Sequence, residues 1–121
     1  MKGRPFLERL GFALAGLRLA LRQEPSLRSH ALAAVVVAGT LWVTGAAPLW
    51  WAVGALTIGL VIVAELANTA IETLADHLHP ERHPQIKAVK DVAAAAVLVA
   101  SIVALAVALA FAVAQGGQGP R

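Results

Sequence analysis

No Asp, Glu, Lys or Arg occurs between Arg28 and Glu65. A membrane-spanning helix needs about 20 apolar residues, so this interval holds two spans if a turn divides it. Gly45-Ala46-Ala47-Pro48 supplies turn-forming residues in the middle. A third apolar run follows Asp91. We therefore predict an all-α integral membrane protein with transmembrane helices at 31–47, 49–76 and 92–114.

The composition agrees with a membrane protein. Hydrophobic residues make up 59% of the 121 residues, charged residues 14%, and the mean hydropathy is +0.73. The absence of cysteine excludes disulfides and thiolate zinc sites. The sequence has neither a Walker A loop nor the signatures of soluble protein kinases. A cleaved signal peptide is disfavoured because a long basic segment precedes the first apolar run and Pro48 follows the candidate cleavage residue Ala47.

The basic residues are divided unevenly along the chain. All but Arg121 lie either up to Arg28 or in the predicted connection 77–90. The positive-inside rule then places the N-terminus and this connection in the cytoplasm. The tail 115–121, which is rich in Gly, is expected on the outer side and poorly ordered.

The segment 4–24 has the pattern of an amphipathic helix that lies on the membrane surface. Five apolar residues fall within about 80° of the helix circumference. They are Phe6, Leu10, Leu14, Leu17 and Leu21. Arginines on the opposite face suit anionic headgroups or nucleotide phosphates, although a basic anchor without a chemical role fits equally well.

A stripe of polar residues lies at the end of the predicted second span. Glu65, Asn68, Glu72 and Asp76 fall within an arc of about 80° on one helix face. An unpaired acid inside a bilayer costs about 2.5 to 3.5 kcal/mol, so several on one face indicate a shared function such as binding a cation, a hydroxyl or a proton.

Helix length places this stripe at the inner interface. The span 49–76 is about 42 Å long, against a hydrocarbon core of about 30 Å. If Trp50 and Trp51 mark the outer interface, Glu65 lies about 24 Å further in, and Glu72 and Asp76 reach the headgroup layer. A lipid and a soluble substrate can meet there, whereas an ion channel would need polar residues across the whole membrane.

These residues suit phosphoryl transfer from a magnesium-bound nucleotide. Mg²⁺ takes one or two carboxylates together with substrate phosphates, and Glu72 and Glu24 are suitable ligands. Glu65 suits a base for the attacking hydroxyl. The cations available for phosphate oxygens are Arg82, Lys87 and Lys90. The same acids suit a small proton-coupled transporter, and the residues alone leave both functions open.

Three blocks of the sequence are more specific than the spacing of the acidic residues. They are Ala15–Ala20 with Glu24, the run Glu-Leu-Ala-Asn-Thr-Ala-Ile-Glu at 65–72, and His83 followed by residues 90–98. Over about residues 4–114 the chain resembles the prokaryotic diacylglycerol kinase family, which includes undecaprenol kinases. The resemblance implies a homotrimer in the bacterial inner membrane that transfers the γ-phosphate of Mg-ATP to a lipid hydroxyl, with active sites shared between subunits.

The resemblance also implies roles for individual residues. Glu65 would be the catalytic base with Asn68 orienting the site, and Glu24 and Glu72 would bind Mg²⁺. The nucleotide contacts would be Phe12, Glu81, His83, Lys90 and Asp91. Phe12 stands where many members have Tyr, so a hydroxyl contact is lost there. We assign lipid-substrate contacts to Arg18, Arg28 and Asp76 at the predicted interface.

Several other polar or aromatic residues receive structural assignments. His77, His79 and His83 with Glu81 suggest a metal cluster, but a loop containing two prolines is a poor frame for one. We assign His30 to the membrane interface. The tryptophans are assigned to the outer belt, and residues 93–96, all Ala, to close helix contacts.

We therefore predict a membrane lipid kinase. The alternatives are a carboxylate-based transporter and a membrane subunit without catalysis. The sequence does not distinguish diacylglycerol from undecaprenol as acceptor, because the acceptor chain would meet apolar surface without distinctive residues. His83-Pro84 after an acidic residue resembles the undecaprenol-type branch more than the enterobacterial one.

Overall fold

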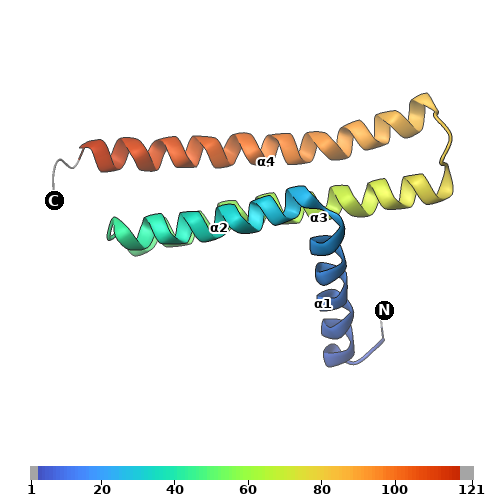
Figure 1. Ribbon diagram of the computed structural model, residues 1–121, viewed down its shortest axis with the longest axis horizontal. Helices are drawn as coiled ribbons and strands as arrows, with labels where there is room; N and C mark the ends of the chain where they lie inside the picture. The colour runs from blue at the N-terminus through green and yellow to red at the C-terminus, as the bar shows by residue number, and fades with distance from the viewer. Residues whose placement is uncertain (1–2, 118–121) are drawn as a thin grey trace.

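The computed structural model describes residues 3–117, and this part of the chain is helical without strands (Figure 1). Its helices are α1 (Phe6–Gln23), α2 (Pro25–Val43), α3 (Pro48–Leu78) and α4 (Pro84–Gly117). The last three are long and apolar enough to cross a membrane. The predicted all-α class, with three membrane-crossing helices after an N-terminal helix, is confirmed.

The helix α3 is the centre of the arrangement. It packs against both α2 and α4, and α1 contacts α2 and α3. In Figure 1, α2, α3 and α4 run lengthwise, whereas α1 projects at a steep angle from the start of α2. The far end of α3 and the beginning of α4 extend past α1. This geometry suits three helices that cross a membrane and one that lies along its surface.

Prolines set the helix starts. Pro25 and Pro48 occupy the first turns of α2 and α3, where the missing N–H breaks no helical hydrogen bond, and α4 begins at Pro84. Glu24 alone separates α1 from α2, and its backbone is extended (φ −112°, ψ 103°), as expected for a residue before proline. Gly45, with φ +64°, makes the turn between α2 and α3.

The structure corrects several predicted boundaries. The predicted connection 77–90 is too long, because α3 continues to Leu78 and α4 already begins at Pro84. Hydropathy marks where a helix leaves the apolar layer, but the helix continues into water until its hydrogen bonding ends. For the same reason α2 begins before residue 31. The predicted tail is helical up to Gly117, and residues 118–121 lie outside the described part of the chain.

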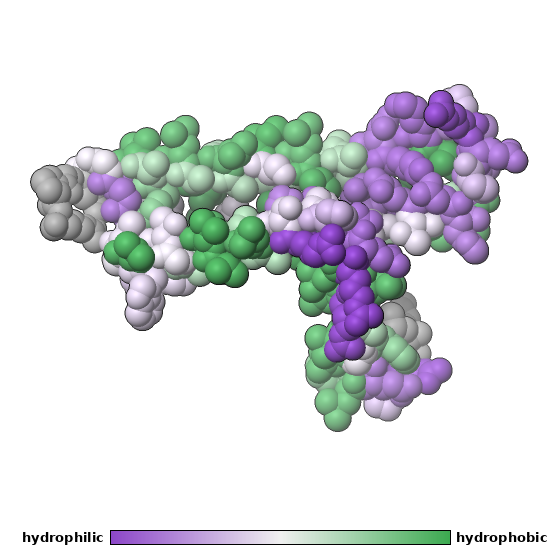
Figure 2. Space-filling model, viewed as in Figure 1, coloured by the Kyte–Doolittle hydropathy of each residue, from purple (hydrophilic) through white to green (hydrophobic). Residues whose placement is uncertain are grey.

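One chain buries few of its apolar side chains. Within residues 3–117 the buried hydrophobic residues are Ala20, Leu27, Leu41, Val61, Ala93 and Ala100. Figure 2 shows apolar surface along the membrane-crossing helices and hydrophilic surface where α3 and α4 join. The exposed apolar surface suits contact with lipid or with other subunits, and the hydrophilic end suits water.

Candidate functional site

Glu65 is the buried charged residue of the described chain, with 7% of its surface exposed. Its carboxylate lies against α2. His30 Nε2 is 2.9 Å from Glu65 Oε1, and the Ser26 hydroxyl donates a hydrogen bond of 3.4 Å to Oε2. Ser26 and His30 lie one helical turn apart, so one face of α2 contacts both carboxylate oxygens. These bonds compensate the desolvation of the acid.

His30 is a site residue that the sequence analysis missed. We assigned it to the interface because a lone histidine carries no motif, and its partner Glu65 is 35 residues away. A signal existed in the pair Ser26 and His30, whose spacing puts two polar side chains on one face at the start of an apolar helix.

Asn68 and Glu72 form the next part of the site, one and two turns beyond Glu65. Asn68 Nδ2 donates a hydrogen bond of 3.2 Å to Glu72 Oε1. Asn68 Oδ1 is buried and has no hydrogen-bond partner among the described residues. Buried polar atoms are nearly always paired, so this oxygen is a free acceptor within the described chain.

Glu24 lies at the joint between α1 and α2. Its side chain is half-buried and does not cap α2. No hydrogen bond links Glu24 to Glu72 in the described chain, and these residues contain no group of three or more acids or histidines placed to hold a metal. Carboxylates and amide oxygens such as those of Glu24, Glu72 and Asn68 are of the ligand type that Mg²⁺ takes together with phosphates and water. Of these three residues, only Asn68 and Glu72 are joined by a hydrogen bond within the described chain.

Lys90 and Asp76 connect the start of α4 with the end of α3. They form an ion pair, and Lys87 Nζ lies 2.6 Å from Asp91 Oδ2 one turn away on α4. Asp76 and Lys90, which the sequence analysis assigned to lipid and nucleotide, are therefore in contact, and Asp91, assigned to nucleotide, directly follows Lys90 in the chain. Asp76 lies near the end of α3, and Lys90 and Asp91 lie on the first turns of α4.

Glu81 and His83 belong to the short connection between α3 and α4. His83 Nδ1 accepts a hydrogen bond of 3.1 Å from the Gln85 backbone N–H at the start of α4. The His79 and His83 rings pack edge to face at 5.4 Å, and His79 Nδ1 lies 3.0 Å from the Glu81 carbonyl oxygen. These contacts shape the connection, and the Glu81 side chain is exposed.

The remaining predicted residues are not joined to the acidic stripe by hydrogen bonds or ion pairs within the described chain. Phe12 and Arg18 lie on α1 with exposed side chains. Arg28 donates a hydrogen bond of 3.4 Å to the Arg22 carbonyl oxygen across the α1–α2 joint. Within the described chain, contacts join Glu65 to α2, Asn68 to Glu72 and Lys90 to Asp76. None of these contacts includes Glu24, Phe12, Arg18 or Arg28.

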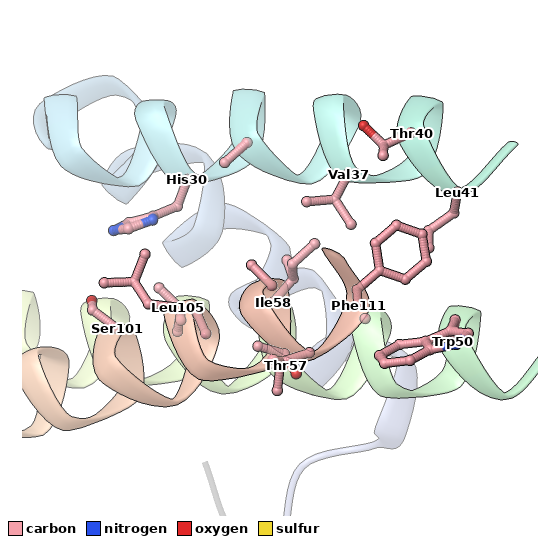
Figure 3. Close-up of a pocket in the computed structure, with 16 residues that line it drawn as sticks. His30, Val37, Thr40, Leu41, Trp50, Thr57, Ile58, Ser101, Leu105 and Phe111 are labelled. Atoms are coloured by element: carbon pink, nitrogen blue, oxygen red, sulfur yellow. The ribbon is translucent and has the colours of Figure 1, made fainter. Parts of the chain in front are cut away.

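An apolar groove of about 570 Å³ begins beside the carboxylate site (Figure 3). It is lined by α2, α3 and α4. His30 and Ser101 lie at one end, and Trp50 and Phe111, whose rings meet edge to face at 5.0 Å, lie toward the other. His30 therefore lines the groove and also contacts Glu65.

Comparison with known proteins identifies the family. The model for prokaryotic diacylglycerol kinase matches residues 11–112. A diacylglycerol kinase of Pseudomonas aeruginosa is 34% identical over 103 residues, 82% of this chain and 84% of that protein. An undecaprenol kinase of Bacillus subtilis is 37% identical over 81 residues, which cover 67% of this chain and 66% of that protein. A diacylglycerol kinase of Escherichia coli is 33% identical over 102 residues, which cover 76% of this chain and 75% of that protein. The transporter alternative finds no support in these similarities. The chain belongs to the prokaryotic diacylglycerol kinase family, a family of bacterial membrane lipid kinases.

Proposed function

We propose that this lipid kinase transfers the γ-phosphate of Mg-ATP to the hydroxyl of a membrane lipid beside Glu65. The observation that carries this proposal is the buried Glu65 carboxylate on the last apolar turns of α3, followed by Asn68 and Glu72 on the same face. The family match to lipid kinases supports this proposal, because Glu65 lies at the predicted inner edge of the apolar layer, where a lipid hydroxyl would reach it.

The proposed reaction assigns one task to each group. Glu65 accepts the proton of the acceptor hydroxyl as its oxygen attacks the γ-phosphorus. The bond between the γ-phosphorus and the bridging oxygen breaks, and ADP leaves with the electron pair. Asn68 Oδ1, unpaired in the described chain, orients the reactants as an acceptor. Lys90 offers a positive charge to the phosphates, and Asp91, Glu81, His83 and Phe12 complete the proposed nucleotide contacts.

Mg²⁺ would be held by Glu24 and Glu72 together with phosphate oxygens. When bound, the ion neutralises charge on the transferred phosphoryl group. Glu72 is oriented for this task by the Asn68 amide N–H. Arg18, Arg28 and Asp76 are proposed contacts for the lipid substrate at the membrane surface.

The proposed orientation puts the site on the cytoplasmic side. Nine of the ten Lys and Arg residues lie either up to Arg28 or between Arg82 and Lys90, which covers the N-terminal part of the chain, the connection between α3 and α4 and the first turns of α4. ATP is available on that side, and the C-terminus would lie outside.

We also propose that the working unit is a trimer with shared sites. Within the described chain, the proposed nucleotide contact Phe12 is exposed, and so are most of the other large apolar side chains. A second subunit would cover that surface and bring opposing residues to Glu65.

The decisive experiment offers γ-labelled ATP to the purified protein in detergent with diacylglycerol and undecaprenol in parallel. We expect label in at least one lipid, and the preferred acceptor identifies the substrate. Both kinds of kinase occur among the relatives. No label in either lipid, in a protein that is folded and oligomeric, would contradict the proposal.

A further inference from the structure

His30 stands between the proposed base and the apolar groove. Its Nε2 is 2.9 Å from Glu65 Oε1, and its ring lines the end of the groove (Figure 3). The histidine side chain is 31% exposed and that of Glu65 8%. The histidine therefore restricts access to the buried carboxylate from the groove side.

The two oxygens of Glu65 are held unequally. Oε1 has the short contact with His30, whereas the Ser26 hydroxyl approaches Oε2 only to 3.4 Å, beyond the usual range for O–H···O bonds. A carboxylate with one oxygen firmly bound has a fixed plane. The loosely bound oxygen is then the one available to a hydroxyl.

We propose that His30 is a positioning residue for the lipid kinase reaction, which orients Glu65 by donating its Nε2–H to Oε1 and so presents Oε2 to the acceptor hydroxyl. The acceptor O–H bond breaks, its proton passes to Oε2, and the Nε2–H stays on the imidazole throughout. This inference rests on the proposed function of Glu65 and adds a residue that the family resemblance did not assign.

The proposal requires a neutral imidazole. A protonated His30 would pair with Glu65 as a full cation, stabilise the carboxylate charge and make it a weaker base. On α3, Glu65 is the charged group that contacts His30. The α4 residue beside His30 in the groove wall is Ser101, and α2 contributes Ser26 to the same carboxylate, so neither neighbour adds a charge.

Two substitutions of His30 test whether its N–H donor positions Glu65 or whether the side chain only fills space. His30→Gln keeps an N–H donor at a similar reach but cannot titrate, whereas His30→Ala removes the donor. We expect His30→Ala to lower kcat about 10- to 100-fold with little change in the KM for ATP, because misplacing a reactive group by about 1 Å costs up to about 10²-fold. His30→Gln should retain most of kcat. His77→Gln, the same change at an exposed histidine of α3, is the matched control.

The coupling between His30 and Glu65 gives a readout that a purely structural role would not change. In a Glu65→Gln background, His30→Ala should have no further effect on the residual rate, because the two residues act as one unit.

The outcomes are distinct. Wild-type protein that phosphorylates no lipid would overturn the proposed function itself. An active wild type in which His30→Ala keeps its kcat would overturn the positioning role alone. If His30→Ala does not fold, as judged by circular dichroism and gel filtration, His30→Gln decides. A loss of kcat in His30→Gln equal to that in Glu65→Gln would also overturn the role.

Discussion

Lys90, on the first turns of α4, and Asp76, near the end of α3, form an ion pair that joins these two helices. Asp76 is more exposed than Lys90, with 62% and 35% of their side chains accessible. The pair holds the lysine on the same side of α3 as the carboxylate stripe. In the proposed reaction this lysine meets the phosphates of ATP.

We therefore expect Lys90→Met to raise the KM for ATP by about tenfold or more. A hydrogen bond to a charged group contributes about 1.5 to 3 kcal/mol, and 1.4 kcal/mol is a factor of ten. Asp76→Asn keeps the lysine and should raise this KM less than threefold. Initial rates over a range of ATP concentrations measure both. Equal effects of the two substitutions would assign Lys90 a structural role only.

Replacement of Glu65 by Gln should abolish turnover while nucleotide binding and folding persist. Gln matches the size of Glu and can still contact Ser26 and His30, but it takes up no proton. Loss of a positioned base lowers rates by about 10² to 10⁴. A single-turnover assay alongside fluorescent-nucleotide binding checks this. Retention of more than a third of the wild-type kcat would remove Glu65 from the role of base.

Glu24→Ala and Glu72→Ala should each shift the magnesium titration of activity to higher concentration. The double variant should be little worse than either single one, because both acids are proposed to hold one ion. Asn68 supports this site through its bond to Glu72. Magnesium titrations of the three variants provide the measurement. Additive losses with an unchanged magnesium midpoint would show that the two acids act separately.

Mixed oligomers should recover activity from two inactive variants. If sites are built across subunits, co-assembly of Glu65→Gln with Glu24→Ala leaves some interfaces with both native residues. We expect partial recovery of lipid phosphorylation in oligomers verified by differential tags. Mixtures that assemble but stay inactive would mean that each chain carries a complete site of its own.

Much of the fold could be predicted from sequence because charge and proline are strong signals in a membrane. The uncharged interval before Glu65 and the turn at Gly45 to Pro48 predicted the α2–α3 pair. The end of α3 and the start of α4 could not be placed, because a helix that leaves the membrane loses its apolar pattern but keeps its hydrogen bonds. The contact from His83 to Gln85 that begins α4 has no hydropathy signature.

The candidate site was predictable within one helix and not between helices. Helical periodicity alone brought Asn68 and Glu72 together, and the structure joins them by a hydrogen bond. The contact of His30 with Glu65 depends on how α2 is rotated and at what height it lies against α3. The rotation and the height of α2 depend on side-chain packing along the whole α2–α3 interface. The local sequence pattern of one helix does not contain that information. The chemical roles of these residues stay predictions.

The burial of Glu65 by α2 also bears on how the chain enters the membrane during synthesis. Ser26 and His30 precede Glu65, so its partners leave the ribosome first. The acid can therefore insert with its hydrogen bonds made, at less than the cost of a bare carboxylate. We expect α2 and α3 to insert as a hairpin before α4 is made. In a translocon assay on chains truncated before Pro84, the double substitution Ser26→Ala and His30→Ala should reduce insertion, and unchanged insertion would contradict this order of events.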